Sequence, residues 1–311
     1  MSRIAVGPGS DPVRPRPTLA GSIPPLVSPL DADRRLDRVA LERQLDRMVG
    51  AVDGLLILGT TGELAILDPR AADELVGIAA ERVGAELRLV LGIGAAGTAG
   101  VLAELRRCRP GITAVAACSP YYMDQLPNRA LRDHFTAIAD AADVPLVLYD
   151  IPSKTANKLP LEVVMELAEH PNVIGIKDSS ADVAAFDALL AARPDGFAVL
   201  QGTREGETGA LYRRGVDGFV AGCENIVPGA IRAVLTAVDA DDAEAEVRAL
   251  ARIASASRVF AIGYPISAVK AAVGMLVGSG GYPAAPLPEL TGDERAAVAA
   301  VLDDLGLERA V

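Results

Sequence analysis

The sequence has 311 residues, of which 50% are hydrophobic and 23% are charged, and its formal net charge is −11. A chain of this length and apolar content can bury a large core, and since (β/α)8 barrels commonly use about 250 residues, the length does not require two domains. The negative charge argues against nucleic acids and anionic membrane surfaces as partners, because both require a clustered positive field. We therefore expect small-molecule ligands.

The first residues differ in composition from the rest of the chain. Residues 1–17 are rich in Pro, Gly and Arg and lack the continuous apolar core of a signal peptide, which predicts a disordered N-terminal arm. No apolar run reaches about 18 uncharged residues, so no membrane span is expected. The three cysteines, Cys108, Cys118 and Cys223, are widely spaced and outside any Cys-x-x-Cys pairing, which favours a reducing, cytoplasmic compartment.

From about Leu19 onward, short β-rich apolar runs alternate with longer segments of helical period, which predicts a parallel sheet connected by helices. Eight strands are expected, at Ile23–Val27, Gly54–Leu58, Leu87–Gly92, Ile112–Ala117, Pro145–Tyr149, Val173–Lys177, Phe197–Gln201 and Gly218–Ala221. Between them, helices are expected at Val39–Val49, Pro69–Val83, Asn128–Ala142 and Leu161–His170. Eight units with short links favour a closed (β/α)8 TIM barrel.

The alternative fold is an open, doubly wound sheet that binds a dinucleotide. No Gly-x-Gly-x-x-Gly turn follows the first expected strand, and Gly92-Ile93-Gly94 lacks the last glycine, so this alternative is the weaker one. The end of the chain changes character and becomes Ala-rich and helical, at Ala243–Val259, Ile266–Val277 and Gly292–Leu305. We therefore divide the chain into a barrel over residues 18–238 and a C-terminal helical region over residues 239–311.

In a barrel of this kind the active site lies at the C-terminal ends of the strands. Reactive side chains follow the second, fourth, fifth and sixth expected strands, in Gly59-Thr60-Thr61-Gly62-Glu63, Ser119-Pro120-Tyr121-Tyr122, Leu148-Tyr149-Asp150-Ile151-Pro152 and Gly175-Ile176-Lys177-Asp178-Ser179-Ser180. We expect these four segments to meet at one end of the barrel.

Lys177 is the most informative of these residues, because the chain contains only four lysines. Lys154 and Lys158 lie in a polar loop, and Lys270 can extend its charged end from an apolar helix toward water. Lys177 instead ends a run expected to be buried, where the ammonium is disfavoured and the free amine that attacks a carbonyl is favoured. That is the requirement for a Schiff base. The alternative is an ion pair with Asp178 or another acid at the barrel rim.

A Schiff-base enzyme that acts on a 2-oxo acid also needs a seat for the carboxylate and a proton shuttle. Thr60 and Thr61 stand between glycines and can offer hydroxyls and backbone N–H groups to one anion, although this sequence also suits a tight turn. Tyr149 ends the strand beside that of Lys177, where its phenol could transfer protons; the alternative is a packed ring with a hydrogen-bonded tip.

The two histidines, His134 and His170, fall in an expected helix or at its end. Neither has a carboxylate or thiol at ligand spacing, so a zinc site is not expected and both are interpreted as helix-surface or helix-end residues.

Together these motifs resemble the dihydrodipicolinate synthase and N-acetylneuraminate lyase family. The resemblance runs over nearly the whole chain from about Ala20: Gly-Thr-Thr-Gly-Glu, Ser-Pro-Tyr-Tyr, Leu-Tyr-Asp-Ile-Pro-Ser and Gly-Ile-Lys-Asp-Ser-Ser occur in the order and approximate spacing of the family. It implies a class I lyase on a (β/α)8 barrel with a C-terminal helical extension, usually assembled as a homotetramer of tight dimers.

The resemblance also implies catalytic roles for individual residues. Lys177 matches the Schiff-base lysine and Tyr149 the phenol that transfers protons. Thr60 matches the hydroxyl that links this phenol to a second tyrosine. That second tyrosine, matched by Tyr122, reaches into the site of the neighbouring subunit in much of the family.

Four further positions are implied to bind substrate. Thr61 would hold the carboxylate, and Gly202 and Val220 match positions that line the pocket. Where synthases of the lysine pathway carry an arginine for the distal carboxylate of the aldehyde, this chain has Lys154, which keeps the charge but lacks the bidentate fork. Conversely, Gln201-Gly202-Thr203 resembles members that cleave 2-keto-3-deoxy sugar acids or hydroxy-oxoglutarate to pyruvate.

The sequence and the resemblance thus predict a Schiff-base lyase or synthase acting on pyruvate or on a 2-oxo acid that yields pyruvate. A 4-hydroxy-tetrahydrodipicolinate synthase and a keto-deoxy sugar acid or hydroxy-oxoglutarate aldolase remain alternatives. No cofactor beyond the covalent lysine Schiff base is expected, and the partners are a 2-oxo acid and an aldehyde. Two other classes stay open, a barrel that binds 2-oxo acids without turnover and a metal-dependent aldolase.

Overall fold

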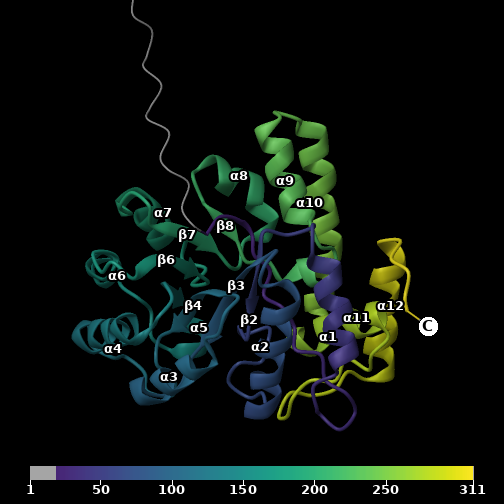
Figure 1. The fold of residues 1–311 in the computed structure, drawn as a ribbon. Helices are drawn as coiled ribbons and strands as arrows, with labels where there is room; N and C mark the ends of the chain where they lie inside the picture. Colours follow the sequence, from purple (N-terminus) through teal and green to yellow (C-terminus); the bar gives the residue numbers. More distant parts are fainter. Residues whose placement is uncertain (1–18, 311) are drawn as a thin grey trace, which may run out of the picture.

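A computed structural model describes residues 19–310, so the arm predicted at residues 1–17 lies outside the described residues. Eight parallel strands form one sheet in the order β1-β8-β7-β6-β5-β4-β3-β2 (Figure 1). Their bounds are β1 (Gly21–Ser22), β2 (Gly54–Ile57), β3 (Arg88–Ile93), β4 (Ile112–Cys118), β5 (Leu146–Asp150), β6 (Val173–Asp178), β7 (Ala198–Gln201) and β8 (Gly218–Phe219). This is the strand order of a (β/α)8 TIM barrel, as predicted.

The barrel is closed by residues 21–26, which bond first to β8 and then to β2. The backbone N–H of Ile23 donates to the carbonyl of Phe219 at 2.9 Å, and the N–H of Leu26 donates to the carbonyl of Leu56 at 2.9 Å. The two outer strands of the sheet are therefore joined, and the barrel has no free edge.

The first strand differs from the prediction of Ile23–Val27, because β1 ends before that segment begins. Residues 24 and 25 are both prolines, which have no N–H to donate to a ladder, so regular pairing stops in front of them. The segment still extends along the barrel, and Pro25 forms an isolated parallel bridge with Leu56.

The helices surround the strands in Figure 1. The predicted helix Pro69–Val83 is confirmed without change, and the other three predicted between strands agree to within two residues. The helices are α1 (Arg38–Met48), α2 (Pro69–Val83), α3 (Thr98–Glu104), α4 (Asn128–Ala141), α5 (Pro152–Thr155), α6 (Leu161–Ala168), α7 (Val183–Ala192), α8 (Thr208–Arg213), α9 (Ala230–Asp239), α10 (Ala243–Ser257), α11 (Pro265–Val277) and α12 (Gly292–Asp304).

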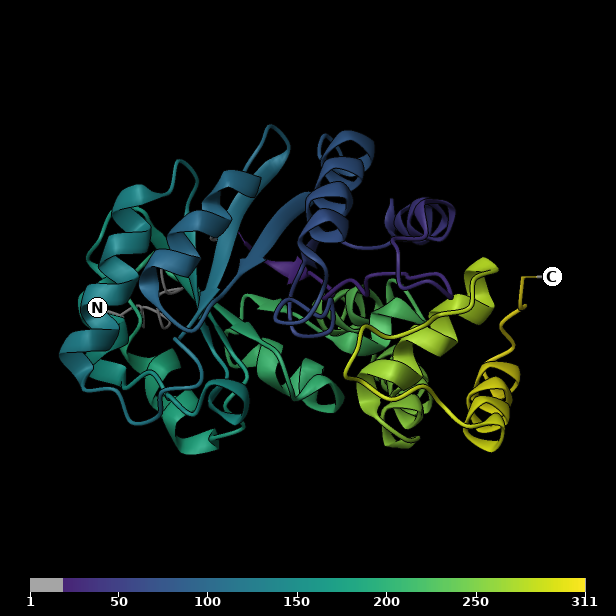
Figure 2. The ribbon, with the colours of Figure 1, turned by 90° about the horizontal axis from the view of Figure 1, so that it is seen from below.

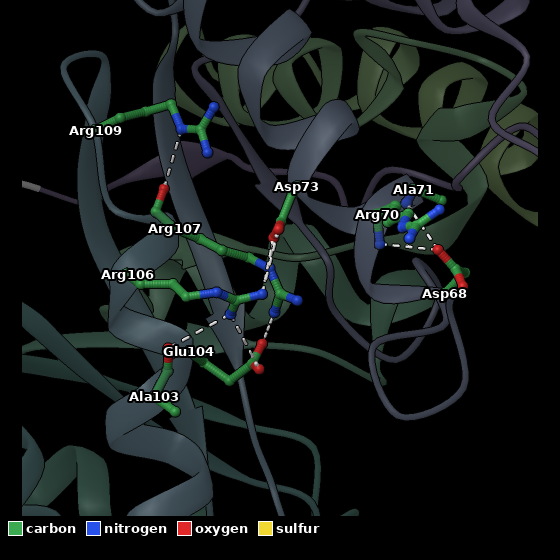
Figure 3. A network of polar contacts seen from close by, with 9 residues as sticks. All are labelled: Asp68, Arg70, Ala71, Asp73, Ala103, Glu104, Arg106, Arg107 and Arg109. Atoms are coloured by element: carbon green, nitrogen blue, oxygen red, sulfur yellow. Dashed lines mark hydrogen bonds and ion pairs between the residues drawn. The ribbon is translucent and has the colours of Figure 1, made fainter.

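Helix α2 shows why the helices begin where the sequence indicates. The side chain of Asp68 accepts hydrogen bonds from the N–H groups of Arg70 at 2.8 Å and Ala71 at 3.3 Å, which caps the first turn (Figure 3). One turn later, Asp73 forms ion pairs with Arg106 and with the buried Arg107, in the turn that follows α3. These contacts tie two neighbouring helices together on the outside of the barrel.

Past α9, the described chain is helical and contains no further strand. Helices α10, α11 and α12 gather on one side of the barrel, where α11 packs against α1 and α12 (Figures 1 and 2). Most of α11 is buried. The C-terminal region therefore covers the outside of the barrel next to its first helix.

No single helix among residues 19–310 has the length and hydropathy of a membrane span. The stretch Ala243–Ala261 and α11 reach that threshold only when they are counted together, and they meet at an angle of 117°.

The barrel interior is filled by side chains. Alternate strand residues point inward and outward, so Ala114 and Ala116 of β4 face the interior while Val115 and Ala117 face the helices. The interior cluster consists of Leu19, Ile23, Leu56, Val90, Ala114, Ala116, Val147, Ala198, Leu200 and Val220. Because the interior is packed, a ligand has to bind at an end of the barrel.

Candidate active site

Lys177 and Tyr149 lie side by side at the C-terminal ends of β6 and β5, where they are partners in the strand register. Both side chains are buried, with exposed fractions of 5% and 4%, and Lys177 Nζ lies 3.9 Å from the centre of the Tyr149 ring. The two residues come from neighbouring strands, so the backbone ladder fixes their spacing.

The alternative in which Lys177 pairs with an acid is not what the structure shows, because Lys177 forms no ion pair with any residue in the range 19–310. Asp178 follows Lys177 on β6, and successive strand residues point to opposite faces. The Asp178 carboxylate instead accepts hydrogen bonds from the N–H and the hydroxyl of Ser180, both at 3.1 Å.

The loop after β2 brings a third predicted residue to this pair. The hydroxyl of Thr60 lies 3.1 Å from the phenol oxygen of Tyr149. Thr60 and Thr61 are both half-buried, and the turn that holds them is closed by a hydrogen bond from the N–H of Glu63 to the carbonyl of Thr60 at 3.1 Å. Lysine, phenol and threonine therefore form one continuous cluster.

Gly202, directly after β7, lies against the Lys177 side chain. A Cβ atom at this position would lie 2.9 Å from Lys177 Cε and 2.2 Å from Ser179 Oγ, closer than atoms can approach. Val220, directly after β8, is buried with the interior cluster, and its N–H donates to the carbonyl of Gln201 at 2.8 Å. The structure thus places Gly202 beside the lysine and Val220 at the end of the packed interior.

Tyr122 is not brought to this cluster. Its side chain is 87% exposed, and its backbone has φ = 81°, a left-handed conformation that is uncommon for a bulky residue. The loop that carries it is held by Asn157, whose side-chain oxygen accepts from the N–H of Leu126 at 2.8 Å and whose amide donates to the carbonyl of Pro120 at 2.9 Å. Sequence reasoning missed Asn157, because nothing in its immediate neighbours indicates such a contact.

Lys154 lies on α5, directly after β5, and its side chain is exposed. Lys158, in the same loop, forms an ion pair with Asp182. The two loop lysines therefore differ: Lys158 has a fixed partner, whereas Lys154 is accessible near the end of the strand that carries Tyr149.

Cys118 is a site residue that sequence reasoning missed. It ends β4, is the register partner of Tyr149, and packs with Tyr149, Ile151 and the partly buried Tyr121. Burial raises the pKa of the Cys118 thiol to about 11, although the charge of Lys177 opposes this change. The thiol therefore lines the site as an uncharged group at neutral pH. Its position directly before Ser-Pro-Tyr-Tyr was the signal that could have revealed it.

The interpretation of the histidines is wrong for His134. This residue of α4 is 3% exposed, and its Nδ1 lies 2.9 Å from the hydroxyl of Thr98. Burial lowers the pKa of His134 to about 4. His170, just past α6, lies 3.1 Å from Asp140. The described part of the chain contains no cluster of three or more His, Cys, Asp or Glu side chains suited to a metal ion.

The expectation for Lys270 is also wrong. Its side chain does not reach water but is 1% exposed, and its ammonium pairs with Glu63 of the loop after β2. The motif glutamate of Gly-Thr-Thr-Gly-Glu therefore contacts the C-terminal region.

The sequence matches the model of the dihydrodipicolinate synthetase family over residues 18–305. A 4-hydroxy-tetrahydrodipicolinate synthase of Stenotrophomonas maltophilia is 37% identical over 231 residues, which cover 73% of this chain and 77% of the relative. An uncharacterized DapA-like lyase of Halobacterium salinarum is 35% identical over 317 residues, which cover 99% of this chain and 100% of the relative.

Solved structures agree with the fold. A chloride-inhibited dihydrodipicolinate synthase from Acinetobacter baumannii complexed with pyruvate has a TM-score of 0.84 and 27% identity, and the match covers 93% of this chain and 100% of that one. A prophage protein of the dihydrodipicolinic acid synthase family from E. coli K12, in complex with pyruvate, has a TM-score of 0.86 and 24% identity, with 93% and 99% covered.

Proposed function

Because the chain belongs to the dihydrodipicolinate synthetase family, we propose that Lys177 forms a Schiff base with the 2-oxo carbon of pyruvate or of a 2-oxo acid that yields pyruvate. The chain is a lyase of the class I aldolase type. One observation carries the proposal: Lys177, Tyr149 and Thr60 meet at one end of the barrel, with the lysine buried against the phenol ring.

The reaction begins when the amine of Lys177 adds to C2 of the acid and forms a carbinolamine. Loss of water gives an iminium. In the direction of synthesis, the pyruvyl iminium loses a proton from C3, and C3 of the resulting enamine adds to an aldehyde whose oxygen takes up a proton. In the direction of cleavage, the C4 hydroxyl of the longer iminium loses its proton, the bond from C3 to C4 breaks, an aldehyde leaves, and the enamine that remains is protonated at C3. Hydrolysis then returns the free lysine and the product.

Tyr149 and Thr60 serve the proton transfers of these steps. The phenol lies beside Lys177, and the hydroxyl of Thr60 is 3.1 Å from the phenol oxygen. A phenol held in this way can donate a proton to the departing carbinolamine hydroxyl and accept it back during hydrolysis. Tyr122 of a neighbouring subunit extends this relay in the proposed assembly.

The carboxylate of the 2-oxo acid is assigned to Thr60 and Thr61, whose hydroxyls and backbone N–H groups can donate to one anion, and the Thr60 hydroxyl lies 3.1 Å from the phenol that is beside Lys177. Gly202 leaves room for the adduct beside the lysine, and Val220 forms the floor of the pocket. Lys154 meets the far end of the second substrate, since its side chain is exposed next to the strand that carries Tyr149.

Two second substrates fit this arrangement. The Stenotrophomonas relative is named a 4-hydroxy-tetrahydrodipicolinate synthase, which supports an aldehyde with a distal carboxylate facing Lys154. A single ammonium binds a carboxylate less specifically than the fork of an arginine, so a hydroxylated aldehyde, as in keto-deoxy sugar acid or hydroxy-oxoglutarate cleavage, fits as well. A direct comparison of pyruvate consumption with aspartate semialdehyde and pyruvate release from sugar acids separates the two.

Trapping with borohydride tests the Schiff base. We expect pyruvate and borohydride to add one reduced pyruvyl group to the protein, at Lys177, and the Lys177→Ala variant to add none. Lys158→Ala is the matched control, because Lys158 is bound to Asp182 outside the cluster, and it should keep the adduct. An adduct that persists in Lys177→Ala contradicts the proposal. An adduct without turnover of any substrate in the panel identifies a barrel that only binds 2-oxo acids.

We also propose a homotetramer of two tight dimers, in which the exposed Tyr122 enters the site of a neighbouring subunit. Full activity of a monomer at micromolar concentration would contradict this. The proposal further includes a cytoplasmic protein that needs no metal or organic cofactor, supported by three free cysteines and by the lysine that activates the carbonyl. Activity should therefore survive a chelator unchanged.

A further inference from the structure

We propose that the buried ion pair between Glu63 and Lys270 is a positioning device for the Thr60–Thr61 loop, so that α11 sets how well the barrel binds its 2-oxo acid. The inference rests on the proposed role of this loop in carboxylate binding. In this role the C-terminal region positions a loop of the site in addition to packing against the barrel. Helix α11 lies on the outside of the barrel beside α1 (Figures 1 and 2).

Both oxygens of the Glu63 carboxylate are used by the C-terminal region. One pairs with the ammonium of Lys270, and both side chains of the pair are completely inaccessible. The other accepts a hydrogen bond from the backbone N–H of Ala284 at 2.8 Å. Two donors at fixed positions therefore define the orientation of this side chain.

The backbone of Glu63 in turn defines the loop. Its N–H bonds the carbonyl of Thr60, and its own carbonyl accepts from the N–H of Leu67 at 2.9 Å. Glu63 adopts φ = 62°, a left-handed conformation that a residue with a side chain keeps only when its surroundings enforce it. The pair with Lys270 supplies such a constraint three positions from the hydroxyl that bonds Tyr149.

Burying two charges costs desolvation free energy, so an ion pair is not needed if the loop only has to be packed. Apolar residues of similar volume commonly stabilise a buried site as well or better. The charges add a fixed position, because a carboxylate bound on one oxygen by an ammonium and on the other by an N–H group cannot move without breaking one of the two contacts. Burial lowers the pKa of Lys270 to about 8 although the charge of Glu63 opposes this, so the ammonium depends on the carboxylate that it holds.

The test measures how borohydride trapping depends on pyruvate concentration in Glu63→Gln and Lys270→Met, using only the folded fraction. We expect the pyruvate concentration for half-maximal trapping to rise at least about tenfold, because small displacements of binding groups strongly weaken productive binding. Val273→Ala is the matched control: Val273 is a buried residue of α11 that does not pair with the loop. It should lower the melting temperature and leave the pyruvate dependence unchanged.

The double variant Glu63→Gln with Lys270→Met separates positioning from stability. It leaves no unpaired charge in the interior, so we expect it to recover most of the melting temperature lost by either single variant, while its pyruvate dependence stays raised. Wild-type pyruvate dependence in the double variant would overturn the inference. If the wild-type protein formed no adduct, the proposed function would fail as well; an adduct with unaffected variants refutes the positioning role alone.

Discussion

The end of β6 and the middle of α11 each bury a lysine, but in opposite surroundings. Lys177 faces the ring of Tyr149 and forms no ion pair with a residue that the structure describes, whereas Lys270 is paired with Glu63. The exposed fractions are similar, 5% and 1%. Burial therefore does not distinguish the proposed Schiff-base lysine from the lysine of the ion pair, and the difference lies in the partner of each ammonium.

Two buried glutamates repeat this contrast. Glu63 has a cationic partner, but Glu224, which is completely buried, has none in the described chain and is held by the hydroxyl of Ser22 and by the N–H groups of Gly229 at 3.0 Å and Ile231 at 3.3 Å. Burial raises the pKa of Glu224 to about 7. The molecule thus contains buried ionisable groups both with and without a counter-charge.

The largest expected effect is a difference in stability between two variants, in which Lys270 or Lys177 is replaced by methionine. Lys270→Met leaves the Glu63 carboxylate buried and unpaired, so the free energy of unfolding should fall by about 3 kcal/mol or more. Lys177→Met breaks no ion pair, and we expect a change below about 1 kcal/mol. Chemical denaturation at neutral pH measures both. Equal losses would remove the distinction between the two lysines.

A smaller effect on catalysis is expected to separate Thr60 from Thr61, the two threonines of the loop after β2. Thr60→Val keeps the shape of the side chain but removes the hydroxyl next to Tyr149, so kcat should fall about 10- to 100-fold. Thr61→Val should instead raise the KM for pyruvate, because Thr61 is proposed to bind the carboxylate. Steady-state kinetics of the two variants check this, and identical changes in kcat and KM would argue against separate roles.

A further expected effect concerns the pH dependence of stability and Glu224, the glutamate without a counter-charge. Since the pKa of Glu224 is raised in the folded protein to about 7 from 4.5, folding favours its protonated form. Its contribution to stability is complete below about pH 4.5 and is lost as the pH rises to about 7.

Glu224→Gln removes the pH-dependent contribution of Glu224 to stability, because the amide does not titrate. Relative to this variant, the free energy of unfolding of the wild-type protein should decrease by about 2 to 3 kcal/mol between pH 5 and pH 8. Urea denaturation at several pH values measures the difference. Parallel curves for the two proteins would show that Glu224 does not change its ionisation in this range.

Local signals in the sequence predicted much of the fold. Asp68 followed by Pro69 sets the start of α2, and Thr291 with Glu294 forms the capping box of α12. Seven of the eight strand segments and the cluster of Lys177, Tyr149 and Thr60 also follow from local runs and strand ends. The first strand lies earlier than the prediction, because Pro24 and Pro25 have no N–H for a strand ladder and regular pairing ends at Ser22.

What the sequence could not provide are the contacts between distant segments. Glu63 and Lys270 are 207 positions apart, and no periodicity indicates that they meet. His134 was misjudged for the same reason, since its burial depends on how α4 packs against the barrel. Tyr122 presents the opposite case, because a motif identified it while the single chain leaves it exposed, and its proposed partner is another copy.

The glycine next to Lys177 limits how this protein can be engineered. A Cβ atom at position 202 would lie 2.2 Å from Ser179 Oγ and 2.9 Å from Lys177 Cε, so libraries that seek new substrates should leave Gly202 unchanged. The side chain of Lys154 is exposed, although Thr155 and Asn157 beside it are buried, so position 154 itself faces no such steric limit. Position 154 is therefore the place to change the proposed second substrate, whereas position 202, beside the proposed Schiff-base lysine, has to remain glycine.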